Sequence, residues 1–169
     1  MKVLGIDPGS ETLGWGVVEG ENLKYKLVDF GTVKSSPREK FSKRLLKVYQ
    51  GVSAVIEKFQ PDVLSIEEAF YAVNVNVAMK LGQVRGAMLV LGEMAGLDIA
   101  EYSPRLIKQT VVGYGNAEKH QVQEMVRLLL RLQKAPEPHD AADALAIAIC
   151  HFHHAGAQNR INMAKLKKN

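Results

Sequence analysis

The run Val3–Ile6 constrains this chain most, because it predicts a strand that is covered on both faces and ends in a carboxylate. An almost continuous apolar run of this length is typical of a buried strand. Asp7 follows directly, and Pro8-Gly9 then forces a turn. A carboxylate in this position is costly unless it is paired, hydrogen-bonded or bound to a cation. Asp7 therefore either caps the turn with its own side chain or belongs to a polar site with other members elsewhere in the chain.

Length and composition describe one ordinary globular domain. The chain has 169 residues, of which 47% are hydrophobic, and this is enough to build a proper core. No apolar run approaches the roughly 20 residues that span a bilayer, and the sequence starts directly with a strand, so we expect neither a membrane segment nor a signal peptide. The single cysteine, Cys150, cannot form an internal disulfide, which favours a cytoplasmic protein.

The net charge of +4 lies in the last residues of the chain. Arg160, Lys165, Lys167 and Lys168 account for all of it, so residues 1–159 carry no net charge. We therefore expect a domain over 1–155 and a basic, flexible tail over 156–169. Overall basicity gives no argument for a nucleic-acid partner, and any anion-binding site must depend on local clusters.

The order of predicted elements is that of an α/β protein. The hydrophobic pattern predicts strands over 3–6, 12–19, 22–33, 62–67 and 97–102, and helices over 37–59, 76–95, 104–112, 117–132 and 140–153. Ser36 and Asn116 are the expected N-caps of the first and fourth helices. The helix over 76–95 is expected to be the longest buried helix, with Val77, Leu81, Val84, Met88 and Leu91 on one buried stripe and 87–91 covered on several sides. The first three strands should form an antiparallel meander. A right-handed crossover through 37–59 makes 3–6 and 62–67 parallel neighbours, so Asp7 and Glu67 end at one sheet edge, where ligands bind in open α/β sheets.

The last predicted helix adds two more carboxylates. Asp140 and Asp143 lie one turn apart on one helix face. The helix dipole alone could explain Asp140, but Asp143 is the one polar residue within Ala141–Cys150. Four carboxylates that converge without a basic partner repel one another, and a divalent cation relieves the repulsion. Hard oxygen ligands suit magnesium or manganese rather than zinc, and two such ions about 4 Å apart can cleave a phosphodiester.

These residues also carry a resemblance to the RuvC Holliday junction resolvases. The motifs are Gly5-Ile6-Asp7-Pro8-Gly9-Ser10, Gly14-Trp15-Gly16, Ile66-Glu67 with Phe70, Lys108–Gly113 with Ala117–Lys119 and Gln121-Val122, and Asp140–Ala146. The resemblance implies an RNase H-like fold with a mixed five-stranded sheet flanked by helices. It also implies a homodimer that nicks two opposing strands of a four-way DNA junction in recombination and repair, together with the RuvA–RuvB branch-migration motor. By the same resemblance, Asp7, Glu67, Asp140 and Asp143 are catalytic and bind two Mg²⁺ ions, which Mn²⁺ could replace.

Two alternatives remain open within this carboxylate set. Glu68 adjoins Glu67, although in a strand it points to the opposite side. Some members of the family use histidine as one of the four ligands, and His139 adjoins Asp140, so His139 could assist or replace a carboxylate.

Several residues are candidates for DNA contacts. Lys119 opposes the helix dipole in a first turn unless an anion binds there, and a solvated lysine is the alternative. The resemblance implies that Lys108 and Lys119 contact the scissile backbone and that Phe70 is a wedge at the junction centre. Tyr71 could stack on unpaired bases beside Phe70, with core packing as the alternative for both. Lys80 and Arg85 are candidate phosphate contacts or members of a solvated helix face.

Two other functions compete with a resolvase. A non-catalytic junction-binding module on the same fold would bind junctions without cutting them. An actin-like or sugar-kinase-type domain also begins with a strand and Asp-x-Gly, but it needs a second similar domain, and this chain shows no internal repeat. ATP competition would favour the latter.

Overall fold

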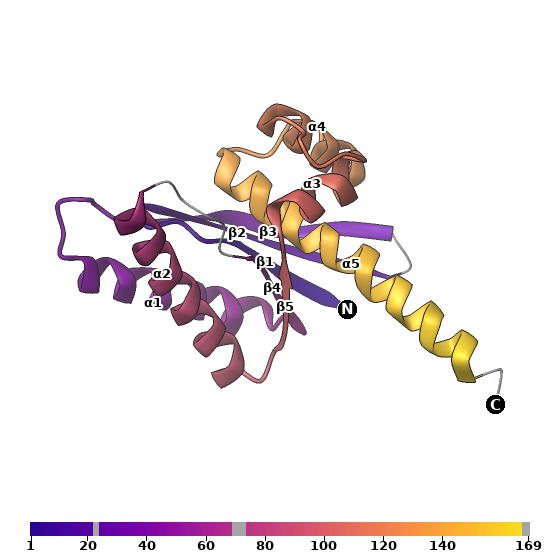
Figure 1. Cartoon of the computed structure of the whole chain (residues 1–169), viewed down its shortest axis with the longest axis horizontal. Coiled ribbons are helices and arrows are strands. Elements are labelled where there is room, and N and C mark those ends of the chain that lie inside the picture. Colours follow the sequence, from indigo (N-terminus) through magenta and orange to yellow (C-terminus); the bar gives the residue numbers. More distant parts are fainter. Residues whose placement is uncertain (22–23, 69–73, 167–169) are drawn as a thin grey trace.

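A mixed five-stranded sheet runs through the centre of the molecule (Figure 1). The computed structural model describes residues 1–21, 24–68 and 74–166, with side chains as far as residue 155. The strands are β1 (Lys2–Asp7), β2 (Thr12–Glu21), β3 (Lys24–Lys34), β4 (Val63–Glu67) and β5 (Asp98–Tyr102), in the spatial order β3-β2-β1-β4-β5. β1, β2 and β3 form an antiparallel meander, and β1, β4 and β5 are parallel. The predicted parallel pairing of β1 with β4 is confirmed.

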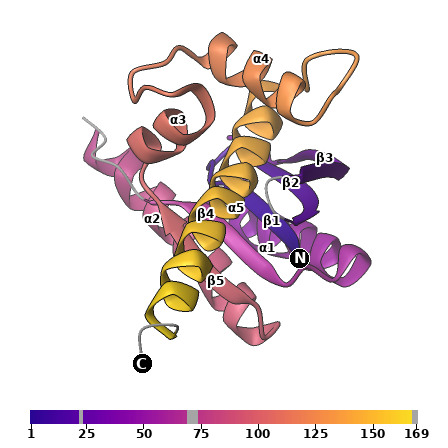
Figure 2. The same cartoon turned by 90° about the vertical axis from the view of Figure 1, so that its right-hand side faces the viewer.

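Helices cover both faces of the sheet. On one face lie α1 (Phe41–Phe59) and α2 (Val75–Met94); on the other, α5 (His139–Leu166) crosses the strands beneath α3 (Pro104–Val112) and α4 (Lys119–Leu129) (Figures 1 and 2). Because side chains alternate along a strand, Val3 belongs to the core on the α5 side and Leu4 to the core on the α1–α2 side. Within the described residues, we find no helix with the length and apolar character that a membrane crossing needs.

α5 lies almost in backbone contact with the sheet. An added Cβ at Gly5 would run into the Ala144 carbonyl, and one at Gly14 would run into the Asp140 carbonyl. Ser65 of β4 also donates a hydrogen bond of 3.1 Å to the Ile147 carbonyl. The strand glycines therefore set the height of the N-terminal half of α5 above β1 and β2.

Two helix starts differ from the sequence prediction. α1 begins at Phe41 rather than after Ser36. One bond of the expected capping box forms, from Ser36 N to the Glu39 carboxylate (3.2 Å), while Ser36 Oγ accepts from Arg38 N (3.3 Å) instead of Glu39 N; both bonds close a turn before the helix. α4 begins at Lys119 with Glu118, not Asn116, as its N-cap. The predicted capping residues thus lie close to the two helix starts, but they do not mark the first helical residue.

The two long helices also correct the prediction. α5, with 28 residues, is the longest helix, not α2. Val84, Met88 and Leu91 of α2 are buried as expected, but Val77 and Val90 are exposed. α5 continues to Leu166, beyond its expected end near residue 153. The division into a 1–155 domain and a 156–169 tail stays a prediction.

Candidate active site

Three of the four predicted carboxylates line one cavity. Asp7 and Glu67 end the neighbouring parallel strands β1 and β4, and Asp143 reaches the same place from the second turn of α5. The cavity has a volume of about 220 Å³ and is also lined by Lys108 of α3 and Lys119 of α4. Five residues that are far apart in the sequence therefore meet where the strand ends face α3, α4 and α5.

Asp140 lies at the edge of this group. It is half-buried at the start of α5, and although it does not line the cavity, its charge raises the pKa of both Asp7 and Asp143. His139 is exposed and lines a different surface pocket, together with Lys34 and Glu137. Glu68 is exposed beyond the end of β4 and is not among the cavity-lining residues. The geometry thus favours Glu67 over Glu68.

The carboxylates are electrostatically destabilised. Burial, followed by the charges of Glu67, Asp143 and Asp140, raises the pKa of Asp7 from 3.8 to about 8. Burial and the charge of Asp143 raise the pKa of Glu67 from 4.5 to about 7, although Lys108 and Lys119 oppose this. Burial raises the pKa of Asp143 too, and nearby Lys119 works against it. The positive charges of the described side chains therefore only partly compensate the negative charge of these carboxylates.

The two lysines supply part of that positive charge. Lys119 Nζ lies 3.6 Å from Asp143 Oδ2, with 67% of the lysine side chain exposed. Lys119 is also the first residue of α4, and the partial positive charge of a helix N-terminus favours an anion. Lys108 is half-buried at the cavity wall. Both lysines are thus placed to contact the carboxylates and an anion that enters from solvent.

The other predicted DNA contacts fall outside the cavity. Lys80 is exposed on α2. Arg85 is turned inward and engaged by protein groups, its Nε donating to the Glu67 carbonyl (3.2 Å). Phe70 and Tyr71 lie outside the described residues.

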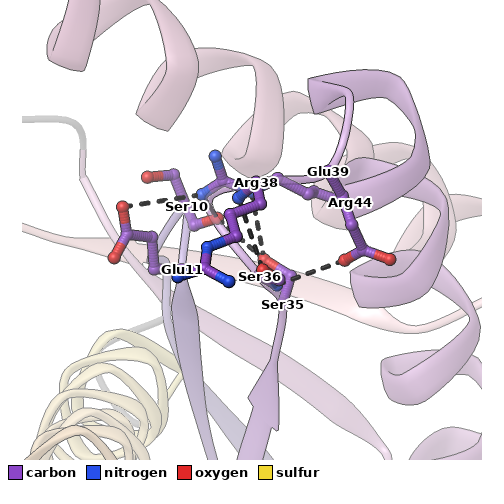
Figure 3. Close-up of polar contacts among 7 residues, drawn as sticks. All are labelled: Ser10, Glu11, Ser35, Ser36, Arg38, Glu39 and Arg44. Carbon is purple, nitrogen blue, oxygen red and sulfur yellow. Dashed lines mark hydrogen bonds and ion pairs between the residues drawn. The ribbon is translucent and has the colours of Figure 1, made fainter.

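The turn after Asp7 is held by a buried arginine that the sequence analysis missed (Figure 3). The Arg44 side chain of α1 is only 5% exposed, and it donates to the Ser10 carbonyl and, through Nε, to Ser35 Oγ (3.2 Å). Ser35 Oγ itself donates to the Ser10 carbonyl (3.1 Å). Glu11 is the nearest carboxylate, at 4.0 Å. This network fixes the backbone three residues beyond Asp7.

Glycine placement is the second feature that the sequence analysis missed. Gly14 pairs with Asp7 across β1 and β2, and its missing side chain admits the Asp140 carbonyl. The Gly14-Trp15-Gly16 spacing, with Gly5 opposite Gly16, is the signal that could have predicted a helix packed directly on these strands.

The oxygen ligands of this cavity suit a hard divalent cation, but the described carboxylates lie too far apart to coordinate one ion together. Carboxylate oxygens around a solvent-open cavity are the ligands that Mg²⁺ and Mn²⁺ take. In the described part of the chain, however, no three or more His, Cys, Asp or Glu side chains are arranged closely enough to hold a metal ion as they stand. Mutual repulsion of the carboxylates and the contact between Lys119 and Asp143 both oppose a closer approach. The carboxylates would have to draw together around the ion.

Comparison with known proteins agrees with this arrangement. The family model described as crossover junction endodeoxyribonuclease RuvC matches residues 3–151. A crossover junction endodeoxyribonuclease RuvC of Chloroflexus aggregans is 48% identical over 97% of this chain and 100% of its own length, and that of Geobacter sulfurreducens is 47% identical over 92% and 94%. Among solved structures, Thermus thermophilus RuvC in complex with a Holliday junction substrate matches with a TM-score of 0.86 and 40% identity, covering 92% of this chain and 94% of that one. The predicted RNase H-like fold class is confirmed.

Proposed function

The chain belongs to the RuvC family of crossover junction endodeoxyribonucleases, and we propose that it resolves Holliday junctions with Asp7, Glu67, Asp140 and Asp143 as its catalytic, metal-binding carboxylates. The observation that carries these assignments is the single cavity in which Asp7, Glu67 and Asp143 meet Lys108 and Lys119. A DNA-cleaving role also supports the expected cytoplasmic location.

Divalent ions are part of this proposal. Two Mg²⁺ ions, or Mn²⁺ in their place, would be held by the four carboxylates and would supply water activation and stabilisation of the leaving oxygen. The raised pKa values of Asp7 and Glu67 support this, since a bound cation would offset both burial and mutual repulsion. His139 is exposed and faces another pocket, which favours Asp140 as the fourth ligand.

The two lysines would hold the DNA backbone. Lys119 combines its own charge with the N-terminus of α4, and Lys108 lines the same cavity. A phosphate bound between the two lysines would compete with Asp143 for the ammonium group of Lys119. Lys119 would thereby release Asp143 for the metal when the substrate arrives. Phe70, Tyr71 and Lys80 stay candidate contacts to the junction.

A homodimer would supply two such sites, because paired symmetric nicks require two cavities related by a two-fold axis. The exposed face of α2 supports this. Val75, Met79 and Val90 are 70%, 59% and 57% exposed and fall on one helical stripe with Gly82 and Gly86. Apart from the nearby backbone of α2 itself and the adjoining residues, no described atom lies within 4 Å of an added Cβ at either glycine, so the described fold of one chain gives no packing reason for them. Close approach of a second α2 would do so. Partnership with RuvA–RuvB is proposed on family membership alone.

A gel assay tests the function. A synthetic four-way junction and a linear duplex of matched sequence are incubated with wild type and with Asp143→Asn, in Mg²⁺, Mn²⁺ or chelator. We expect paired symmetric nicks on the junction alone, which depend on the divalent ion and are lost in the variant. Asp98→Asn, at the opposite end of the sheet, is the matched control and should cut normally. Junction binding by wild type without nicks in either metal would support the non-catalytic module instead.

A further inference from the structure

Arg85 occupies a protected position behind the candidate active site. It projects from the flank of α2 toward the ends of β4 and β5, and its side chain is 19% exposed. One arm of the guanidinium forms an ion pair with Glu101 of β5, while Nε donates to the Glu67 carbonyl at 3.2 Å. The group is therefore already engaged by protein on two sides, which leaves little of it for the phosphate contact that the sequence suggested.

The peptide group that follows Glu67 is held at both of its ends. Its carbonyl oxygen accepts from Arg85, and its N–H, which belongs to Glu68, donates to the Tyr102 carbonyl at 2.9 Å. Rotation of this peptide plane would break one bond or both. Because the backbone at Glu67 sets the direction of its side chain, the two bonds together aim the Glu67 carboxylate into the cavity.

Glu101 has a defined part in this arrangement. It neutralises the charge of a mostly buried guanidinium, which would otherwise be costly to keep at this position. It also fixes the guanidinium from the β5 side, so that Nε stays directed at Glu67. The planar fork of arginine can serve a carboxylate and a carbonyl at once, whereas the ammonium of a lysine is a point charge and cannot reproduce that geometry.

We propose that Arg85 and Glu101 act as a pair that positions the catalytic carboxylate of Glu67, and that Arg85 does not serve as a DNA phosphate contact. The inference rests on the proposed function, since it takes Glu67 as part of the cleavage site. It assigns Arg85 and Glu101 as positioning residues. It also makes α2, the helix with the exposed apolar stripe, a support of the catalytic strand end.

The first test uses the DNA-free protein, so that it does not depend on cleavage. We expect the Glu68 amide to exchange with solvent deuterium about tenfold or more faster in Arg85→Gln than in wild type, because the peptide loses one of its two anchors. Arg127→Gln is the matched control: Arg127 also pairs with a glutamate, Glu124, and also donates to a carbonyl, that of Leu132, but on α4. Unchanged exchange at Glu68 in Arg85→Gln would overturn the proposal.

The second test separates positioning from phosphate binding. At saturating junction, Arg85→Gln and Arg85→Lys should nick about 10- to 100-fold more slowly, since small misplacements of a reacting group cost that much, and Glu101→Gln should follow in the same direction. The double variant Arg85→Gln with Glu101→Gln should nick no more slowly than Arg85→Gln alone. The Kd for the junction and the salt dependence of that Kd should stay unchanged in all these variants. If Arg85 were a phosphate contact, Arg85→Gln would instead weaken junction binding and lower the slope of log K against log salt concentration by about one, and Arg85→Lys would restore binding. That result would overturn the proposal.

The controls keep the two proposals apart. Arg127→Gln should nick within about twofold of wild type, because surface pairs contribute little. Thermal unfolding of each variant separates misfolding from positioning. If wild type binds junctions but does not nick them, the proposed function fails, while the exchange result still decides whether Arg85 anchors the backbone at Glu67.

Discussion

The helices α5 and α2 have similar apolar compositions but opposite surroundings. Over residues 141–150, nearly every α5 side chain is buried, and the glycines that allow its close approach belong to the strands beneath it. α2 buries one stripe and leaves another exposed, and its glycines Gly82 and Gly86 lie on the helix itself with open space beside them. Close packing is thus complete within one chain at α5 and incomplete at α2. The first arrangement builds the site, and the second supports the proposed interface.

The largest expected effect concerns the acids beside α5. In metal-free buffer, Asp7→Asn should raise the free energy of unfolding at pH 8. In Mg²⁺, the same variant should lose cleavage and keep junction binding. The pKa of Asp7 is about 8 in the folded protein, against 3.8 for an aspartate exposed to water in the unfolded chain, so folding favours its protonated form. Its favourable contribution is present at low pH and is lost as the pH rises from about 4 to 8. The upper limit of this loss is about 6 kcal/mol.

Urea unfolding from pH 4 to pH 8 measures this effect. The stability advantage of Asp7→Asn over wild type should grow with pH, and Mg²⁺ should reduce it by stabilising wild type more. Parallel pH curves for the two proteins would contradict the electrostatic account of the cluster. Loss of junction binding together with cleavage would point instead to a structural role for Asp7.

Gly5→Ala tests the packing of α5 on the sheet. Its new methyl group would meet the backbone of α5 at Ala144 and Ala148, which cannot move away as a flexible side chain could. We expect a loss of about 3 kcal/mol in the free energy of unfolding. The control is Gly86→Ala on α2, measured at a protein concentration too low for self-association, where it should keep or raise the stability of the monomer by up to about 1 kcal/mol. Equal unfolding midpoints in urea for the two variants would remove the difference between the helices.

Much of the site could be predicted because its signals are local. Asp7 and Glu67 each end a buried strand, and the crossover rule makes those strands neighbours; Asp143 is the lone acid of an apolar helix segment. The partners of Arg44 and Arg85 could not be predicted, since an arginine gives no sequence signal for a distant carbonyl. Periodicity likewise predicts which α2 residues share a face, but not what covers that face, so Val77 and Val90 were wrongly placed in the core.

The proposed α2 interface gives the third prediction. Gly82→Leu with Gly86→Leu should weaken self-association at least about tenfold, equivalent to about 1.4 kcal/mol, because bulky side chains would hold two helices apart. Sedimentation equilibrium at micromolar concentration measures this. Leu128→Gln, which changes an exposed leucine of α4, should leave association unchanged. A wild type that stays monomeric with and without junction DNA would contradict the homodimer.

The smallest expected effect lies at the start of α2. The Asn74 side chain accepts hydrogen bonds from Asn76 N (3.0 Å) and Val77 N (3.3 Å), while Val75 and Val77 in that first turn are exposed. The cap therefore holds a turn that core packing does not, and Asn74→Ala should cost about 1 kcal/mol in the free energy of unfolding. Asn74→Asp keeps an acceptor and should retain the wild-type value. If the alanine variant unfolds at the same urea midpoint as wild type, contacts other than the cap hold this turn. A second copy of α2 is then the first candidate for those contacts. In that case the urea midpoint should fall when the protein is diluted.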